Sequence, residues 1–381
     1  MPSPTVLPAA FWRRPGQRTT RSARGSRRAA ARLLTALVSI AALVAGGIGM
    51  YRLLARPYRL PLVIGAVPFW DLPHSLPAVI NHRHVIDEVT PWWYSLGNDG
   101  SVISEVPGGA AAEQGVLNRL AATGVGLVPS IADTTDHAWA PMVIQAILHD
   151  PTRRHAHEQQ LATFATTRGF TGLQIDYEDL TLADRDVFTQ FIGELADTLH
   201  ACGKTLYVTV HPKTTDAGYD QRNLAQDYPA LGRSADKIIV MAYDWRWSTS
   251  AAGPIAPLSW VTDVLRYASS RIPADKLVLG LGLYGYDWVG QQGQAITWQQ
   301  ADTLAHTPGV TSGWDPISSA PHLSYDRDGA HHEVWYENAH SLTPKLDLAT
   351  TYHLGGVELW RLGAQDPGLW TPLTDRHHTA T

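Results

Sequence analysis

The stretch from Gly169 to Glu178, Gly-Phe-Thr-Gly-Leu-Gln-Ile-Asp-Tyr-Glu, constrains the fold more than any other part of the chain. It is typical of a buried strand, and because side chains alternate along a strand, Gln174, Asp176 and Glu178 share one face. The opposite face is apolar and can pack on helices. Burying an acid at every second position is costly unless each carboxyl is hydrogen-bonded or neutral. Acids at the C-terminal end of such a strand are typical of the catalytic rim of a parallel α/β barrel.

Strand-like and helix-like segments alternate after residue 57. The candidate strands are short apolar runs with β-branched residues: Leu62–Pro68, Glu88–Ser95, Val125–Ile131, Gly172–Glu178, Thr205–His211, Lys237–Tyr243, Lys276–Tyr284 and Gly356–Leu362. Helical patterns lie between most of them, which requires parallel crossovers. Eight such strands predict a (β/α)8 TIM barrel over residues 57–375. Short alternating runs after the seventh strand predict a small α+β insertion at about 289–336, which could form a wall of a binding cleft.

The N-terminal part has a composition of its own. Residues 1–32 contain eight Arg and neither Lys nor an acid, which predicts a disordered tail. Subtracting those eight charges from the net charge of −5 leaves −13 for the remainder, and this argues against nucleic-acid binding. Residues 33–50 are apolar or small, and roughly 18 such residues can cross a bilayer. With Arg on the N-terminal side, we expect a cytoplasmic tail, a transmembrane signal-anchor helix at residues 33–52 and an extracytoplasmic catalytic part.

The alternative to an anchor is a signal peptide that is cleaved near the end of the apolar run, which would give a secreted protein. The small-x-small pairs that could serve as cleavage sites, Ala45 with Gly47 and Gly47 with Gly49, lie inside the run. The run is also longer than a usual signal core, so the anchor is favoured.

Several segments resemble family 18 of the glycoside hydrolases. The strand described above is similar to the signature Asp-Gly-x-Asp-x-Asp-x-Glu, with Thr171 and Gln174 in place of the first two acids and with Asp176 and Glu178 retained. Residues 240–245 are similar to the family's sixth-strand segment. Segments 253–260, 276–288, 334–338 and 355–363 resemble its bacterial branch of spore-cortex and cell-wall lytic N-acetylglucosaminidases. The resemblance runs from about residue 60 to about 372 and implies a TIM-barrel glycosidase.

The resemblance also implies a role for individual residues. In this family the substrate's 2-acetamido group is the nucleophile, which is an exception to the two-carboxylate rule for glycosidases. Glu178 would protonate the leaving oxygen and then act as general base. Asp176 would orient the acetamido N–H, Tyr243 would donate a hydrogen bond to the acetamido oxygen, and Trp360 would form an apolar floor under the sugar. The further expected substrate contacts are Gln174, Met241, Asp244, Tyr284 and Trp70.

Elementary electrostatics supports the acid pair independently. Two carboxylates at i and i+2 on one strand face are close, so both cannot easily ionise in a water-poor site. One pKa should therefore rise and keep a proton available near neutral pH.

These observations predict a monomeric retaining glycosidase that needs no metal or organic cofactor. The expected substrates are β-1,4-linked glycans containing N-acetylglucosamine, with peptidoglycan favoured over chitin oligomers. The rival hypothesis is a lectin-like barrel that binds glycan at the cell envelope without cutting it. Gln174 favours this rival, whereas the retention of Asp176, Glu178 and Tyr243 favours an enzyme.

Overall fold

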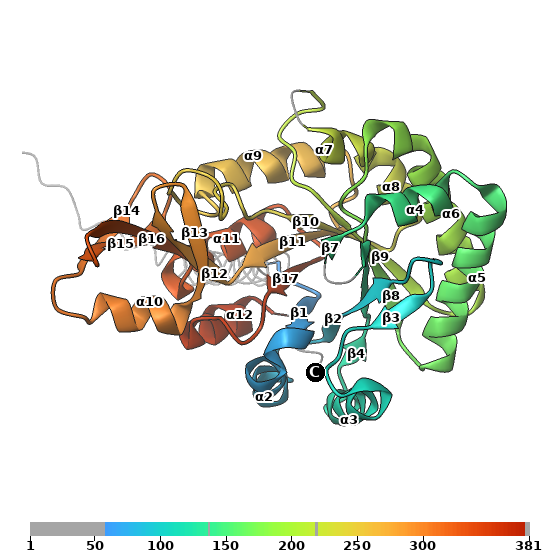
Figure 1. Cartoon of the computed structure of the whole chain (residues 1–381), viewed down its shortest axis with the longest axis horizontal. Coiled ribbons are helices and arrows are strands. Elements are labelled where there is room, and N and C mark those ends of the chain that lie inside the picture. Colours follow the sequence, from blue (N-terminus) through green and yellow to red (C-terminus); the bar gives the residue numbers. More distant parts are fainter. Residues whose placement is uncertain (1–57, 136–137, 218–219, 378–381) are drawn as a thin grey trace, which may run out of the picture. The chain divides into compact units, whose positions relative to one another are not determined.

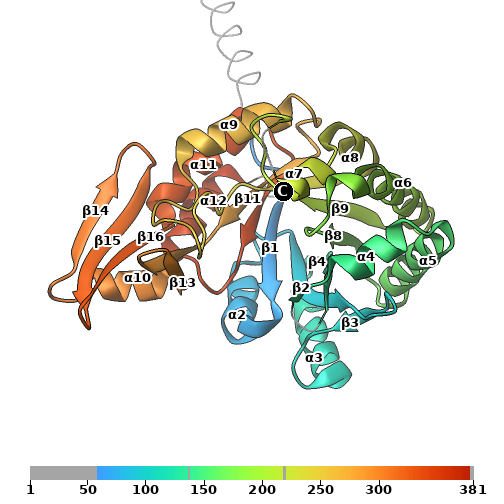
Figure 2. The same cartoon turned by 45° about the horizontal axis from the view of Figure 1, so that its top comes forward.

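Eight parallel strands form a closed barrel in the computed structural model, which describes residues 58–135, 138–217 and 220–377 (Figures 1 and 2). In barrel order these strands are β1 (Val63–Pro68), β2 (Glu88–Leu96), β5 (Ser130–Ala132), β8 (Gly172–Asp176), β9 (Thr205–Val210), β10 (Lys237–Met241), β11 (Leu277–Gly282) and β17 (Gly356–Trp360). The barrel closes because β1 pairs with both β2 and β17. The predicted TIM-like barrel is confirmed.

Helices surround the strands on the outside of the barrel (Figure 2). The α-helices are α2 (Leu72–His82), α3 (Gly109–Ala121), α4 (Pro141–Leu148), α5 (Pro151–Thr167), α6 (Arg185–Ala201), α7 (Gln221–Ala225), α8 (Tyr228–Ser234), α9 (Leu258–Ser269), α10 (Trp298–Ala305), α11 (Ala339–Thr351) and α12 (Trp370–Arg376). Short 3-10 helices lie at η1 (Phe69–Asp71), η2 (Leu182–Asp184) and η3 (Pro367–Leu369). Small strands accompany the first barrel loops: β3 (Val102–Ser104), β4 (Gly126–Leu127), β6 (Thr134–Thr135) and β7 (Ala138–Trp139).

An antiparallel sheet with one helix follows the seventh barrel strand, as the sequence predicts. Its strands are β12 (Tyr284–Val289), β13 (Gln292–Thr297), β14 (Thr311–Asp315), β15 (Ala320–Arg327) and β16 (Ala330–Tyr336). Helix α10 covers a small apolar core of its own, which includes Ile296, Leu323 and Val334. The sheet starts at Tyr284, before the expected boundary at 289, because the chain leaves β11 at Leu283, whose N–H donates to the Trp360 carbonyl (2.6 Å).

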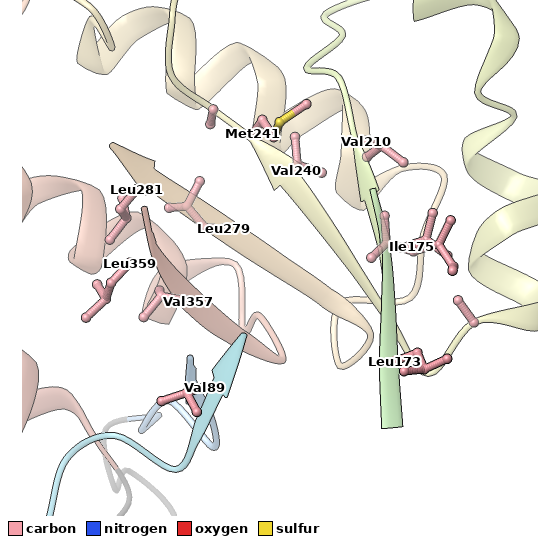
Figure 3. Packing of buried hydrophobic residues seen from close by; sticks show 14 of the residues in the cluster. Val89, Leu173, Ile175, Val210, Val240, Met241, Leu279, Leu281, Val357 and Leu359 are labelled. Carbon is pink, nitrogen blue, oxygen red and sulfur yellow. The ribbon is translucent and has the colours of Figure 1, made fainter. Parts of the chain in front are cut away.

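Two apolar layers lie on either side of the barrel wall. Outward-facing strand residues such as Leu173, Ile175, Leu279 and Leu359 are fully buried or nearly so against the helices (Figure 3). Inside the barrel, a second cluster fills the lower part of the interior. It consists of Ile64, Val128, Tyr207, Ile239 and Val278, with Leu62 packed against it. The interior is therefore a packed core, with Glu88 at the start of β2 accepting from the Tyr207 hydroxyl (2.8 Å), and the further polar inward-facing residues occupy the strand ends above it.

The predicted N-terminal segments, the tail at residues 1–32 and the membrane helix at residues 33–52, lie outside the described residues. Within the described part of the chain, every helix is too short or too polar to span a bilayer.

A buried ion pair fixes the segment that leads from the inserted sheet back into the barrel. Lys345 Nζ on α11 lies 2.6 Å from Glu337 Oε2 just after β16, and each side chain is 1% exposed. Burial raises the pKa of Glu337 and lowers that of Lys345, and each charge opposes the effect of burial on the other. Ser341 Oγ also donates to the Glu337 carboxylate (2.5 Å).

Removing one partner of this pair should be more harmful than removing both. We expect Lys345→Met to lower the free energy of unfolding by about 3–5 kcal/mol, because Glu337 would remain buried without its cation. Glu337→Gln combined with Lys345→Met should recover most of that loss. Urea denaturation of the two variants measures the difference, and equal destabilisation by the single and double changes would contradict this interpretation.

Candidate active site

Strand β8 carries the acids to the mouth of the barrel. Leu173 and Ile175 point into the outer apolar layer, so Gln174 and Asp176 face the interior. The strand begins with Gly172, where a Cβ would lie 2.3 Å from the Thr205 carbonyl oxygen on β9. A residue with a side chain at position 172 would therefore force β8 and β9 apart.

The chain turns immediately after Asp176, two residues earlier than the strand expected from the sequence. Tyr177 enters the outer core, where its hydroxyl hydrogen-bonds His157 Nε2 (2.8 Å). Glu178 therefore lies on the loop above the strand rather than within it. Its carboxyl is partly exposed at 18%, whereas Asp176 below it is 4% exposed.

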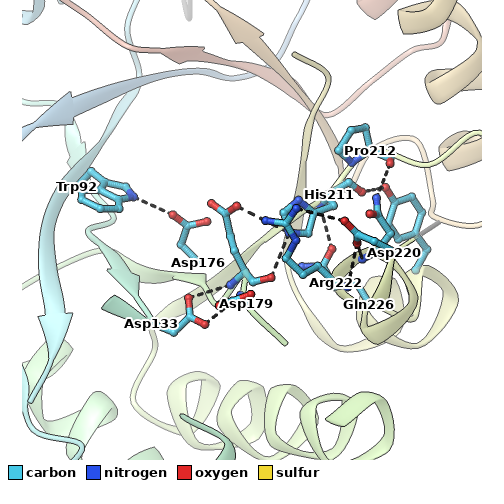
Figure 4. Close-up of polar contacts among 12 residues, drawn as sticks. Trp92, Asp133, Asp176, Asp179, His211, Pro212, Asp220, Arg222 and Gln226 are labelled. Atoms are coloured by element: carbon cyan, nitrogen blue, oxygen red, sulfur yellow. Dashed lines mark hydrogen bonds and ion pairs between the residues drawn. The ribbon is translucent and has the colours of Figure 1, made fainter. Parts of the chain in front are cut away.

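Asp176 is held by an indole from the neighbouring strand β2. Trp92 Nε1 donates to Asp176 Oδ2 (2.8 Å), which fixes the carboxyl beneath the mouth (Figure 4). Burial raises the pKa of Asp176 to about 6, and the hydrogen bonds from Trp92, Thr209 and Glu178 oppose that rise. The donors therefore favour the ionised form of Asp176 against the effect of its burial.

A second carboxylate, Asp133, holds the backbone that carries Glu178. Asp133 Oδ1 accepts from the Glu178 N–H (2.9 Å) and Oδ2 accepts from the Asp179 N–H (3.1 Å), as Figure 4 shows. Asp133 follows β5 and is 1% exposed. Burial raises its pKa to about 7, and the nearby charge of Asp176 adds to this effect.

The electrostatics at Glu178 favour its protonated form. Burial raises the pKa of Glu178 well above its ordinary value, and the charges of Asp176 and Asp133 raise it further against the opposing charge of Arg222. His211 Nε2 lies 3.8 Å from Glu178 Oε2 and 3.1 Å from the Glu178 carbonyl oxygen. Since burial lowers the pKa of His211 to about 4, this imidazole is neutral near pH 7 and brings no positive charge to the acid.

Tyr243 occupies space that two glycines of β11 leave free. A Cβ on Gly280 would lie 3.1 Å from Tyr243 Cε1, and a Cβ on Gly282 would lie 3.1 Å from Tyr243 Cβ. Burial raises the pKa of Tyr243 well above its ordinary value, so its hydroxyl stays protonated and remains a donor. Asp244 follows with a φ of 56° and accepts from the Tyr284 hydroxyl (2.5 Å).

Aromatic side chains line the cleft beside these groups. A cavity of about 610 Å³ is bordered by Trp70, Asp244, Tyr284 and Trp360, among others, and includes residues of the inserted sheet. A second cavity of about 390 Å³ is bordered by Trp70 and Trp92, among others. Trp70 therefore borders both cavities, and it is 48% exposed.

The structure brings most of the predicted site residues together. Glu178, Asp176 and Tyr243 share the barrel mouth, since the charges of both acids act on the Tyr243 phenol. Trp360, Asp244, Tyr284 and Trp70 border the larger cavity. Gln174 and Met241 are 4% and 8% exposed, and they are absent from the linings of both cavities, as are Glu178, Asp176 and Tyr243.

Sequence reasoning missed the residues that hold the acids, namely Asp133 and the indole N–H of Trp92. A usable signal existed for Asp133, because it stands two residues past a predicted strand and acids there face the same rim. Within residues 58–135, 138–217 and 220–377, no three His, Cys, Asp or Glu side chains are arranged to hold a metal ion.

Comparison with known proteins decides the family. The sequence pattern described as "Glycosyl hydrolases family 18" matches residues 119–365. The chain belongs to this family. The resemblance drawn from the motifs is therefore confirmed, and the barrel-mouth acids lie inside the matched region.

Relatives of the family 18 chain include proteins named for spore-wall lysis. It is 31% identical over 257 residues to the "Cortical fragment-lytic enzyme" of Bacillus subtilis, covering 66% of this chain and 60% of that protein. It is 26% identical to the crystal structure of the Bacillus cereus spore cortex-lytic enzyme SleL, with a TM-score of 0.77 over 85% of this chain and 76% of that one. A chitinase from Chromobacterium violaceum matches at 27% identity, with a TM-score of 0.76 over 82% and 98%. The chain thus spans about 60% of the length of the Bacillus subtilis relative.

Replacing Asp133 tests whether it positions Glu178. Asp133→Asn keeps one acceptor and loses the other, so we expect kcat to fall by about tenfold as the Glu178 loop shifts. The negative charge of Asp133 raises the pKa of Glu178, so its removal should lower that pKa and move the alkaline limb of the kcat/KM profile to lower pH.

The matched control is Asp150→Asn on the outer helix α5. Asp150 also accepts from two backbone N–H groups, those of Thr152 and Arg153, but it caps a helix outside the barrel. It should leave the pH profile unchanged. An Asp133→Asn enzyme with the wild-type pH profile and kcat would contradict the assigned role.

Proposed function

We propose that this family 18 protein is a retaining glycoside hydrolase that cleaves β-1,4 bonds of glycans containing N-acetylglucosamine, with the substrate's own acetamido group as nucleophile. The observation that carries the proposal is the arrangement at Glu178. The Glu178 carboxyl stands at the barrel mouth beside Asp176, and burial together with the charges of Asp176 and Asp133 raises its pKa. A general acid at neutral pH requires such an environment.

In the first step the acetamido oxygen attacks the anomeric carbon while the glycosidic bond breaks. Glu178 gives its proton to the departing oxygen, so the leaving sugar departs as an alcohol. A water molecule then attacks the anomeric carbon, and ionised Glu178 takes a proton from that water as the acetamido group is released. Two displacements at one carbon give net retention of configuration.

Asp176 and Tyr243 act on the attacking amide. The ionised Asp176 carboxylate stabilises the acetamido N–H as positive charge develops on that group, because a fixed charge in a water-poor site costs no reorganisation. The Tyr243 hydroxyl donates to the acetamido oxygen and aims it at the anomeric carbon. Trp92 contributes by holding the Asp176 carboxyl in place.

Other residues bind the sugar. Trp360 offers its ring face under the reacting sugar. Asp244, held by the Tyr284 hydroxyl, and Trp70 provide the polar and stacking contacts of the larger cavity. Gln174 and Met241 act from beneath the site by packing and hydrogen bonding rather than by lining a cavity.

Cell-wall glycan, that is peptidoglycan, is the favoured substrate, and chitin oligomers are the second candidate. The names of the relatives from Bacillus subtilis and Bacillus cereus, which refer to cortex lysis, support the first. The chitinase from Chromobacterium violaceum supports the second. We also propose that the apolar run at residues 33–52 anchors the protein with its barrel outside the cytoplasm, where such glycans occur.

Removing the proton donor tests the proposal. Glu178→Gln keeps the shape of the side chain but cannot donate and recover a proton, so hydrolysis of N-acetylglucosamine oligomers should fall by at least about a hundredfold. Reducing-sugar release by the full-length chain measures this. Glu333→Gln, at an exposed position of β16, is the control and should hydrolyse at the wild-type rate.

The two outcomes that oppose the proposal are distinct. Equal hydrolysis by Glu178→Gln and wild type would remove Glu178 from the chemistry. Binding of the oligomers by the wild-type protein without any turnover would instead favour a lectin-like barrel.

The dependence on the substrate's amide is a separate prediction. Oligomers of N-acetylglucosamine should be cleaved at least about a hundredfold faster than glucose oligomers of equal length, because glucose lacks the internal nucleophile. Digestion of purified cell wall and of chitin oligomers, with the products separated by chromatography, ranks the two candidate substrates. Comparable cleavage of the glucose oligomers would contradict substrate-assisted catalysis.

A further inference from the structure

A third interior carboxyl, Glu358, lies in the barrel and has no place in the mechanism above. Val357 and Leu359 point into the outer core, so Glu358 on β17 faces inward, as Trp360 does (Figure 3). Glu358 is 2% exposed, and its Oε1 accepts from Thr90 Oγ1 on β2 (3.1 Å). A carboxyl buried so deeply needs donors, a cation or a proton of its own.

No cation is among the described groups that shift the pKa of Glu358. Its register partners are Ile64 on β1 and Gly280 on β11, which carry no charge. The charged group that acts on it from β8 is Asp176, which is itself an acid, and the titratable group that it faces on β10 is the Tyr243 phenol. Burial raises the pKa of Glu358 to about 7, with the charge of Asp176 adding to the rise.

The polar groups beside Glu358 include an acceptor that lacks a donor. Gln174 Nε2 donates to Thr209 Oγ1 (2.8 Å), but no described residue donates to Gln174 Oε1. Hydrogen bonding with the Gln174 side chain lowers the pKa of Glu358 against the larger effect of its burial, and hydrogen bonding with Thr209 lowers that of Asp176. A row of adjacent polar groups therefore runs from Glu358 through Gln174 and Thr209 to Asp176. A buried acceptor without a donor loses stability, so a donor at this point is strongly favoured.

We propose that Glu358 is a positioning residue that carries a proton and starts a hydrogen-bond chain ending on Asp176. The Glu358 O–H donates to Gln174 Oε1, Gln174 Nε2 donates to Thr209 Oγ1, and the Thr209 hydroxyl donates to Asp176. Each donor in such a chain polarises the next. The chain supplies Asp176 with a donor from below, in addition to Trp92 from the side. This inference rests on the proposed function, in which Asp176 must stay ionised.

Loss of the Glu358 proton reverses the chain. An ionised Glu358 is only an acceptor, so the Gln174 amide turns over to donate to it, and Gln174 Oε1 then accepts from the Thr209 hydroxyl. Thr209 no longer donates to Asp176, and a second negative charge faces that residue. Asp176 then gains a proton more readily, and the acetamido group loses its charged partner.

The kinetic test uses three variants of the full-length chain with N-acetylglucosamine oligomers. Glu358→Met removes the first donor and Thr209→Val removes the last link, so each should lower kcat by about tenfold while KM changes less than about twofold. The kcat of the double variant should be about equal to that of either single variant, because both changes break the same hydrogen-bond chain. Glu358→Gln keeps a donor that cannot ionise, so its kcat should exceed that of Glu358→Met at least about tenfold and its alkaline limb should move to higher pH.

The loss of kcat must be separated from any loss of stability. Glu358→Met leaves Gln174 Oε1 without a donor and should lower the free energy of unfolding, whereas Glu358→Gln keeps a donor, so kcat is compared at a temperature at which every variant is fully folded. Multiplicative losses in the double variant, a wild-type kcat in Glu358→Met, or a Glu358→Gln alkaline limb identical to that of wild type would each overturn the proposal.

The protonation of Glu358 can be tested without any measurement of hydrolysis. The infrared difference spectrum of wild type minus Glu358→Gln should show the carbonyl band of a protonated carboxylic acid at pH 6, and the band should vanish as the pH rises past about 7. A difference spectrum that shows only an ionised carboxylate at pH 6 would overturn the proposal. A wild-type protein that shows the band but hydrolyses no oligomer would contradict the proposed function and not the protonation of Glu358.

Discussion

Crowding of carboxyl groups in a dry barrel mouth is the constraint on which the site depends. Asp133, Asp176, Glu178 and Glu358 are all inside or at the rim of one barrel, and burial raises the pKa of each. Such groups cannot all be ionised together. The donors decide where the charge is placed: Trp92 favours it on Asp176, and the crowding retains the proton on Glu178. One ionised and one protonated acid at neighbouring positions is the pair that acid catalysis through an internal amide requires.

The barrel tolerates this crowding of carboxyl groups because its apolar core lies below the acids. The lower interior is filled by an apolar cluster that includes Ile64 and Val278, and the catalytic acids lie at the strand ends above this cluster. Glycines on β11 give Tyr243 its place over the acids, since a Cβ on Gly280 would contact its ring at 3.1 Å. Packing in the lower interior and open space at the mouth therefore position the acids at the strand ends.

Much of the fold and half of the site could be predicted from the sequence. The alternation of polar and apolar residues in Gly172–Glu178 identified the inner face of β8, because successive side chains of a strand point to opposite sides of the barrel wall. Asp133 and Glu358 were missed, since a single acid in or after an otherwise apolar strand does not reveal which strands face it across the interior. The start of the inserted sheet at Tyr284 was also missed, because β11 and β12 form one continuous apolar run in the sequence and separate only through a tertiary hydrogen bond at Leu283.

The central claim is that Glu178 holds its proton at neutral pH, and a direct titration tests it. Carbon-13 NMR of the labelled side-chain carboxyls, with Glu178→Gln to assign the resonance, follows this one group as the pH changes. The account predicts that the Glu178 carboxyl is still protonated at pH 7, since burial and the charges of Asp176 and Asp133 raise its pKa. Titration of the resonance near 4.5, the ordinary value for a glutamic acid, would contradict it.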